Sequence, residues 1–133
     1  KKIHIFRRSW DMAPAPLNKN NPNHPLNIEI YKNIPRNKIP DTESLKDTYE
    51  RVIYYYLKNI EPLIQNDKNV LISAHGNTLR ALCKKILNIS NKKIVKLEIP
   101  TGNPLLIGFT NNLKVNEFKY LDTKRAKKIL FNV

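Results

Sequence analysis

Glycine, cysteine and acidic clusters are scarce in this 133-residue chain. Its three glycines form no glycine-rich phosphate loop ending in Lys-Ser or Lys-Thr, and no carboxylate pair is suited to Mg²⁺. The one cysteine, Cys83, rules out an intrachain disulfide framework, and no zinc-ligand spacing occurs. We therefore expect no metal centre, and we interpret Cys83 as a core thiol on the apolar face of a helix.

Long hydrophobic runs are absent as well. No run approaches the roughly 18 apolar residues of a transmembrane helix, and the N-terminus lacks the hydrophobic region of a signal peptide. We expect a cytoplasmic protein with no membrane partner. The chain opens at Lys1 without a methionine, so we also expect it to be cut or processed from something longer. Its length and its 41% hydrophobic content suit about one domain with a real core.

Negative charge is in short supply: 11 Asp and Glu face 24 Lys and Arg, for a net charge of +13. Such a balance suits nucleic acid, an acidic surface or anionic small molecules. The lysines, however, are spread along the chain among many asparagines and isoleucines, as an A+T-rich genome would encode by drift. The basic charge could therefore reflect either the base composition of the genome or selection for a basic surface. The charge alone does not distinguish these two explanations.

Proline and periodicity divide the chain. Most of the nine prolines fall in residues 13–41, which predicts a long irregular loop. A helix follows from Asp41, with N-cap candidates Asp41, Thr42 and Ser44, and Pro62 is expected to kink or end it.

The second half alternates strands and helices. We predict a buried strand over 69–74, a helix over 77–88, a short helix over 91–95 capped by Ser90 and a brief strand entry at 96–99. A rigid turn at 100–104 then leads into strands at 105–109 and 115–121, followed by a basic tail at 122–133. This order indicates an α/β fold with a parallel pair and a terminal hairpin.

The chemistry concentrates at the predicted strand-to-helix turn. His75 would lie at the carboxyl end of a strand, where ligands of open α/β sheets collect. Gly76 lets backbone approach a bound group closely, and Asn77 adds an amide donor beside a helix N-terminus. The first N–H groups of a helix have no intrahelical partner and favour anions. Converging donors without a metal site point to metal-free phosphoryl transfer.

Four blocks in this sequence resemble the cofactor-dependent phosphoglycerate mutases. Residues 73–82 (SAHGNTLRAL) are similar to the signature of that family. Residues 6–11 (FRRSWD), 43–48 (ESLKDT) and 99–105 (IPTGNPL) match three further blocks in the family's order. The resemblance implies that residues 1–133 are the C-terminal part of a single domain. That domain would have a three-layer α/β/α fold with a mostly parallel sheet and a terminal hairpin.

The resemblance also implies a reaction and roles. Family members interconvert 2-phosphoglycerate and 3-phosphoglycerate through a phosphohistidine primed by 2,3-bisphosphoglycerate, in glycolysis and gluconeogenesis. His75 would be the catalytic histidine that donates to the phosphoryl oxygens rather than the nucleophile. Gly76 and Asn77 would hold the phosphoryl group, and Arg7 and Arg8 would clamp the carboxylate and phosphate of the glycerate.

The family's Arg-His-Gly-Glu and Glu-Arg-His-Tyr motifs do not occur in the chain. The nucleophilic histidine would therefore come from an N-terminal half or a second chain, and family members are often homo-oligomeric. Without those neighbours, we expect residues 1–133 to be marginally stable, since the strand at 69–74 would leave a sheet edge open. Alternative hypotheses for the function are a histidine-phosphatase-type phosphomonoesterase, a degenerate non-catalytic fragment, or a basic protein that binds anions or nucleic acid. The blocks at 43–48 and 99–105 favour the mutase.

Overall fold

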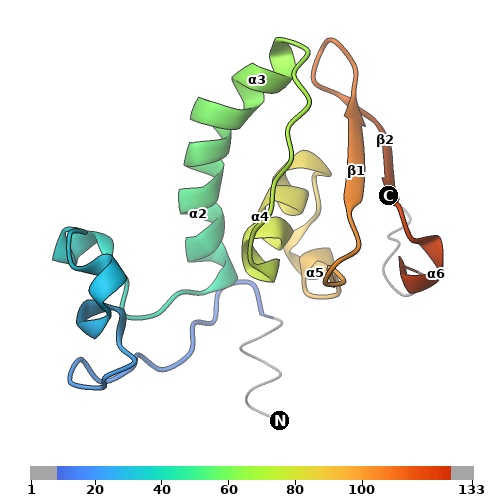
Figure 1. Cartoon of the computed structure of the whole chain (residues 1–133). Helices are drawn as coiled ribbons and strands as arrows, with labels where there is room; N and C mark the ends of the chain where they lie inside the picture. Colours follow the sequence, from blue (N-terminus) through green and yellow to red (C-terminus); the bar gives the residue numbers. More distant parts are fainter. Residues whose placement is uncertain (1–8, 127–133) are drawn as a thin grey trace.

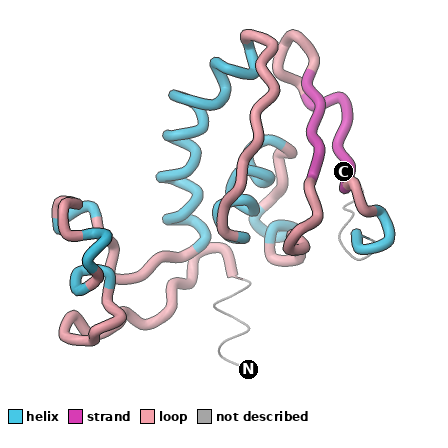
Figure 2. The backbone as a smooth tube through the Cα atoms, viewed as in Figure 1, coloured by secondary structure: helices cyan, strands magenta, loops and turns pink. Residues whose placement is uncertain are grey.

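A computed structural model describes residues 9–126 of the chain, so Arg7 and Arg8 lie outside the described residues. Figure 1 shows a long helix, a shorter helix reached by an extended segment, and a hairpin with a small helix after it. Figure 2 shows how much of the rest is loop, and the lobe that precedes the long helix is loop with a few short helical turns. The chain is therefore α/β, and the long helix and the shorter helix pack on each other.

Helix α2 (Leu45–Tyr55) begins with a capping box. Of the three N-cap candidates, Ser44 is the one used: its side chain accepts from the Asp47 N–H, and the Asp47 side chain accepts from the Ser44 N–H at 2.8 Å. Each residue thus satisfies an N–H group that the helix cannot bond internally. The hydrogen bonds from Ser44 hold the pKa of Asp47 below its usual value.

Pro62 ends the regular part of this helix, as expected. A π-helical turn, η4 (Tyr56–Ile60), precedes the short helix α3 (Glu61–Gln65), and the Glu61 N–H donates to the Tyr56 carbonyl. A proline ring clashes with the carbonyl four residues before it, and the wider turn makes room for that ring.

Helices α4 (Gly76–Ile86) and α5 (Asn91–Ile94) carry much of the core. Ser90 caps α5, as predicted, by accepting from the Lys93 N–H. Cys83 is buried, and its burial raises the pKa of the thiol to about 11, which confirms a core thiol. The buried cluster contains Leu45, Val52, Tyr56, Ala81, Leu82, Cys83, Ile89, Ile94, Leu97, Tyr120 and Ala126.

The terminal hairpin forms as predicted. Strands β1 (Leu105–Phe109) and β2 (Val115–Tyr120) are antiparallel, with Leu105 opposite Tyr120. Gly102, at φ +68°, makes the preceding turn, and helix α6 (Thr123–Ala126) follows β2. β1 is less buried than predicted, because Leu106 is 45% exposed on the outer face.

The prediction of a buried strand at 69–74 is wrong for this chain. Residues 69–75 carry no strand assignment, and Leu71 is 93% exposed. The expected parallel pair is therefore not formed, and 96–99 is not a strand either: within residues 9–126 the sheet has two strands, β1 and β2. A strand needs a partner for its N–H and C=O groups, and these two strands pair with each other.

The long loop at 13–41 contains only 3₁₀ turns: η1 (Pro25–Asn27), η2 (Glu29–Tyr31) and η3 (Arg36–Lys38). His24, for which the sequence carried no signal, is fully buried within it. Its Nδ1 accepts from the Leu26 N–H at 3.2 Å, and its Nε2 lies 3.4 Å from Asp41 Oδ1. This histidine therefore ties the loop to the residues leading into α2.

Candidate functional site

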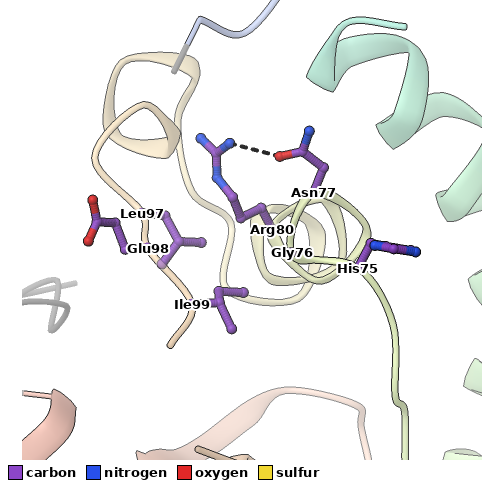
Figure 3. Close-up of a pocket in the computed structure, with 7 residues that line it drawn as sticks. All are labelled: His75, Gly76, Asn77, Arg80, Leu97, Glu98 and Ile99. Carbon is purple, nitrogen blue, oxygen red and sulfur yellow. Dashed lines mark hydrogen bonds between the residues drawn. The ribbon is translucent and has the colours of Figure 1, made fainter. Parts of the chain in front are cut away.

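A pocket of about 510 Å³ opens at the N-terminus of α4. Figure 3 shows its two walls, one from the start of α4 and one from the extended residues after α5. It is lined by His75, Gly76, Asn77, Arg80, Leu97, Glu98 and Ile99.

His75 is the N-cap residue of α4, with extended backbone at φ −63° and ψ 151°. Its carbonyl accepts from the Leu79 N–H at 3.1 Å, so the helix starts directly after it. The His75 side chain makes no capping hydrogen bond and is exposed, and its ring points away from Arg80 and the wall at 97–99 (Figure 3). An N-terminus without a side-chain cap keeps N–H groups and the positive end of the helix dipole available to an anion.

Gly76 is the first residue of α4, and the fold itself does not demand glycine there. Apart from the adjacent residues and the backbone of the helix itself, no atom lies within 4 Å of the position that a Cβ would take, and its φ is not in the left-handed region. Space at a helix N-terminus is where a bound oxyanion contacts backbone N–H groups.

Asn77 is held by Arg80, one helical turn later. Arg80 Nη1 donates to Asn77 Oδ1 at 3.2 Å, and Arg80 Nη2 donates to the Ile94 carbonyl at 2.8 Å. Arg80 is only 6% exposed, and its contact with the Ile94 carbonyl is buried, whereas its contact with Asn77 is partly buried. One guanidinium therefore joins the two walls of the pocket.

The structure brings together three of the five predicted site residues. His75, Gly76 and Asn77 line one pocket, whereas Arg7 and Arg8 lie outside the described residues. The sequence reasoning gave no role to Arg80, although it stands in the same block and at i+3 from Asn77, where helical side chains meet. The wall at 97–99 was also missed, because only packing brings it to α4.

Within residues 9–126, no group of three or more His, Cys, Asp or Glu side chains could hold a metal ion. In the same part of the chain, every helix is too short or too polar to cross a membrane.

The sequence is similar to known proteins over most of its length. Residues 12–118 match the family model of the histidine phosphatase superfamily (branch 1). A protein of Pelagibacter ubique (strain HTCC1062) named 2,3-bisphosphoglycerate-dependent phosphoglycerate mutase is 60% identical over 97% of this chain and 54% of its own length.

Proteins of the same name in Hydrogenobaculum sp. (strain Y04AAS1) and Xylella fastidiosa (strain 9a5c) are 43% and 41% identical over 100% and 99% of the chain. The chain covers 54% and 55% of these two proteins. It therefore spans about half the length of the curated relatives it matches.

Proposed function

Because this chain belongs to the histidine phosphatase superfamily, we propose that it forms the C-terminal part of a phosphoglycerate mutase. The reaction would be the interconversion of 2-phosphoglycerate and 3-phosphoglycerate by phosphoryl transfer, in the cytoplasm. The observation that carries the proposal is the uncapped start of α4, where His75, Gly76 and Asn77 line one pocket. The names and the identity of the relatives support the choice of substrate.

His75 would donate a hydrogen bond to a phosphoryl oxygen. In phosphoryl transfer, charge spreads over three equatorial oxygens, so fixed donors around them stabilise the transition state. His75 is exposed and does not cap its own helix, so its side chain can turn toward a phosphoryl group at the start of α4.

Gly76 and Asn77 would hold the same group through a backbone N–H and a side-chain amide. The open space at Gly76 suits an oxygen atom placed against the helix N-terminus. Arg7 and Arg8 would clamp the carboxylate and phosphate of the glycerate, since guanidinium groups donate paired hydrogen bonds to both.

The nucleophilic histidine would come from a polypeptide outside this chain, either a second chain or an N-terminal half. The relatives have further sequence that could hold it: the chain matches 54% of the length of its 60% identical relative. The exposed extended segment at 69–74, with Leu71 93% exposed, supports this, because a strand from that region would pair with it and cover Leu71. That pairing would build the mostly parallel sheet of a three-layer α/β/α fold.

The primer 2,3-bisphosphoglycerate fits the chemistry of these donors. The pocket at the helix N-terminus offers an imidazole, an amide and backbone N–H groups, all suited to a phosphate. When bound, the primer supplies a phosphoryl group for the histidine of the other half, and His75, Gly76 and Asn77 would hold its phosphate.

The test is complementation. The 133-residue chain would be mixed with the separately produced remainder of the Pelagibacter ubique relative, and 2-phosphoglycerate formed from 3-phosphoglycerate would be measured with 2,3-bisphosphoglycerate present. We expect turnover that His75→Ala lowers by about 100-fold or more, as the loss of one hydrogen-bond donor to the transition state typically does. The matched control Lys92→Ala changes an exposed residue of α5 and should leave the rate unchanged. Turnover that His75→Ala leaves intact would contradict the proposal.

A second candidate is phosphomonoesterase activity, favoured by the match to the histidine phosphatase superfamily over residues 12–118. The two reactions differ in the acceptor of the phosphoryl group, which is water in one and a glycerate hydroxyl in the other. Release of inorganic phosphate without formation of 2-phosphoglycerate, in the same mixture, would favour the phosphatase.

A further inference from the structure

We propose that Arg80 is a positioning residue that turns the amide of Asn77 so that its NH₂ group, and not its oxygen, is left to bind a phosphate. The inference rests on the proposed function and adds a residue to which the sequence reasoning assigned no role. It follows from the two hydrogen bonds of Arg80 and from the hydrogen-bonding capacity of each side chain.

The orientation of an asparagine amide is set by its partners, because its oxygen only accepts and its nitrogen only donates. Arg80 carries donors only, so the atom of Asn77 that faces Nη1 at 3.2 Å must be the oxygen. The nitrogen then lies on the side of the amide away from Arg80, as Figure 3 shows. A phosphate accepts hydrogen bonds and donates few, so an amide turned the other way would present an oxygen to it and repel it.

Arg80 is itself held in place by a second hydrogen bond, so it can fix the orientation of the Asn77 amide. Its second nitrogen, Nη2, donates to the carbonyl of Ile94, a residue with no exposed surface at the end of α5. A planar guanidinium fixed at one nitrogen is fixed at the other, so the Ile94 contact also sets the position of Nη1. A lysine could make only one of these two contacts in the same geometry.

Two roles for Arg80 must be separated, since it lines the pocket and carries a positive charge. A residue that attracts phosphate directly would act independently of Asn77. A positioning residue acts through Asn77, so its removal should cost nothing once Asn77 has lost its amide.

The first measurement needs no ligand. Nuclear magnetic relaxation of the Asn77 side-chain NH₂ group in the full 133-residue chain would report how ordered the amide is. We expect an ordered amide in the natural chain and a loss of order in Arg80→Met and in Arg80→Lys. The control Arg125→Met removes a guanidinium that donates to the carbonyls of Thr101 and Gly102, and it should leave the Asn77 amide ordered. Equal order in the natural chain and both Arg80 variants would overturn the proposal.

The second measurement is a double-mutant cycle on binding of 3-phosphoglycerate by calorimetry. We expect Arg80→Met and Asn77→Ala each to weaken binding by about tenfold, and the double variant to bind as weakly as Asn77→Ala alone. Losses that multiply to about a hundredfold would overturn the proposal, because Arg80 would then contact the ligand itself. If the natural chain fails to bind 3-phosphoglycerate, the proposed function loses support, and the order of the Asn77 amide still decides the role of Arg80.

Discussion

Gly76 and Gly102 should respond differently to the same substitution, and Gly76→Ala is the more informative case. At Gly76 a Cβ meets no atom within 4 Å, and the backbone is ordinary helix. Alanine restricts the unfolded chain and favours helix, so the variant should gain about 0.4–1 kcal/mol in free energy of unfolding. The same methyl group would project where we propose that a phosphoryl oxygen sits. Crowding of this kind costs about 1–3 kcal/mol, or roughly a 5- to 150-fold loss of affinity.

Gly102→Ala is the matched control, in which the stability should fall and the affinity should stay the same. Gly102 has φ +68°, where an L-residue is strained by about 1–2 kcal/mol, so this variant should unfold more easily by that amount. It does not line the pocket, so its affinity for 3-phosphoglycerate should not change.

The assay combines urea unfolding followed by circular dichroism with calorimetric titration of 3-phosphoglycerate, on the natural chain and both variants. We expect Gly76→Ala to raise the free energy of unfolding and to lower the affinity for 3-phosphoglycerate. Unchanged affinity of Gly76→Ala would refute the placement of the phosphoryl group against the start of α4. A loss of stability in Gly76→Ala would show instead that the fold requires glycine there.

Three further predictions concern the scaffold. Ser44→Ala should lower the free energy of unfolding by about 1 kcal/mol in urea titrations, because it removes the cap of α2. The hydrogen bonds from Ser44 lower the pKa of Asp47 in the fold, so the stability that its ionised form contributes is present above the ordinary pKa of 3.8 and is lost as the pH falls through the lowered pKa. The natural chain should show this loss in acid, and Ser44→Ala should show much less of it. Cys83, with its pKa raised to about 11, should react with a thiol reagent at pH 7 only at the rate of unfolding, and a fast reaction in the folded chain would contradict its burial. Because Leu71 is 93% exposed, Leu71→Ser should change the free energy of unfolding of the monomer by less than about 0.5 kcal/mol. The same variant should reduce self-association measured by light scattering. A large loss of stability would mean that the Leu71 side chain is packed.

Local chemistry in the sequence was enough to predict several elements. A helix start needs a side-chain acceptor, which makes Ser44 one of three N-cap candidates and Ser90 the predicted cap of the short helix, and both serines cap helices in the structure. Pro62 was expected to disturb its helix, and a π turn precedes it. These features depend on neighbours within a few residues, which the sequence displays directly.

The strand predicted at 69–74 shows where such reasoning fails. An apolar run indicates that a segment prefers to be buried. A strand also needs hydrogen-bonding partners for its backbone, which come from elsewhere in the chain or from another chain. Within residues 9–126 the only strand pairing is between β1 and β2, so Leu71 remains exposed despite its pattern. His24 shows the converse case, a residue without any sequence signal that the loop buries completely.

The candidate site likewise has one part that the sequence predicts and another that depends on the tertiary structure. The sequence by itself determined that His75, Gly76 and Asn77 are adjacent at the start of a helix, because a turn of three residues is a local event. Only the tertiary structure decided that Arg80 holds the Asn77 amide while reaching the Ile94 carbonyl, and that residues 97–99 form the facing wall. Those contacts depend on how α4 and α5 pack, and packing is fixed by the whole core rather than by any stretch of sequence.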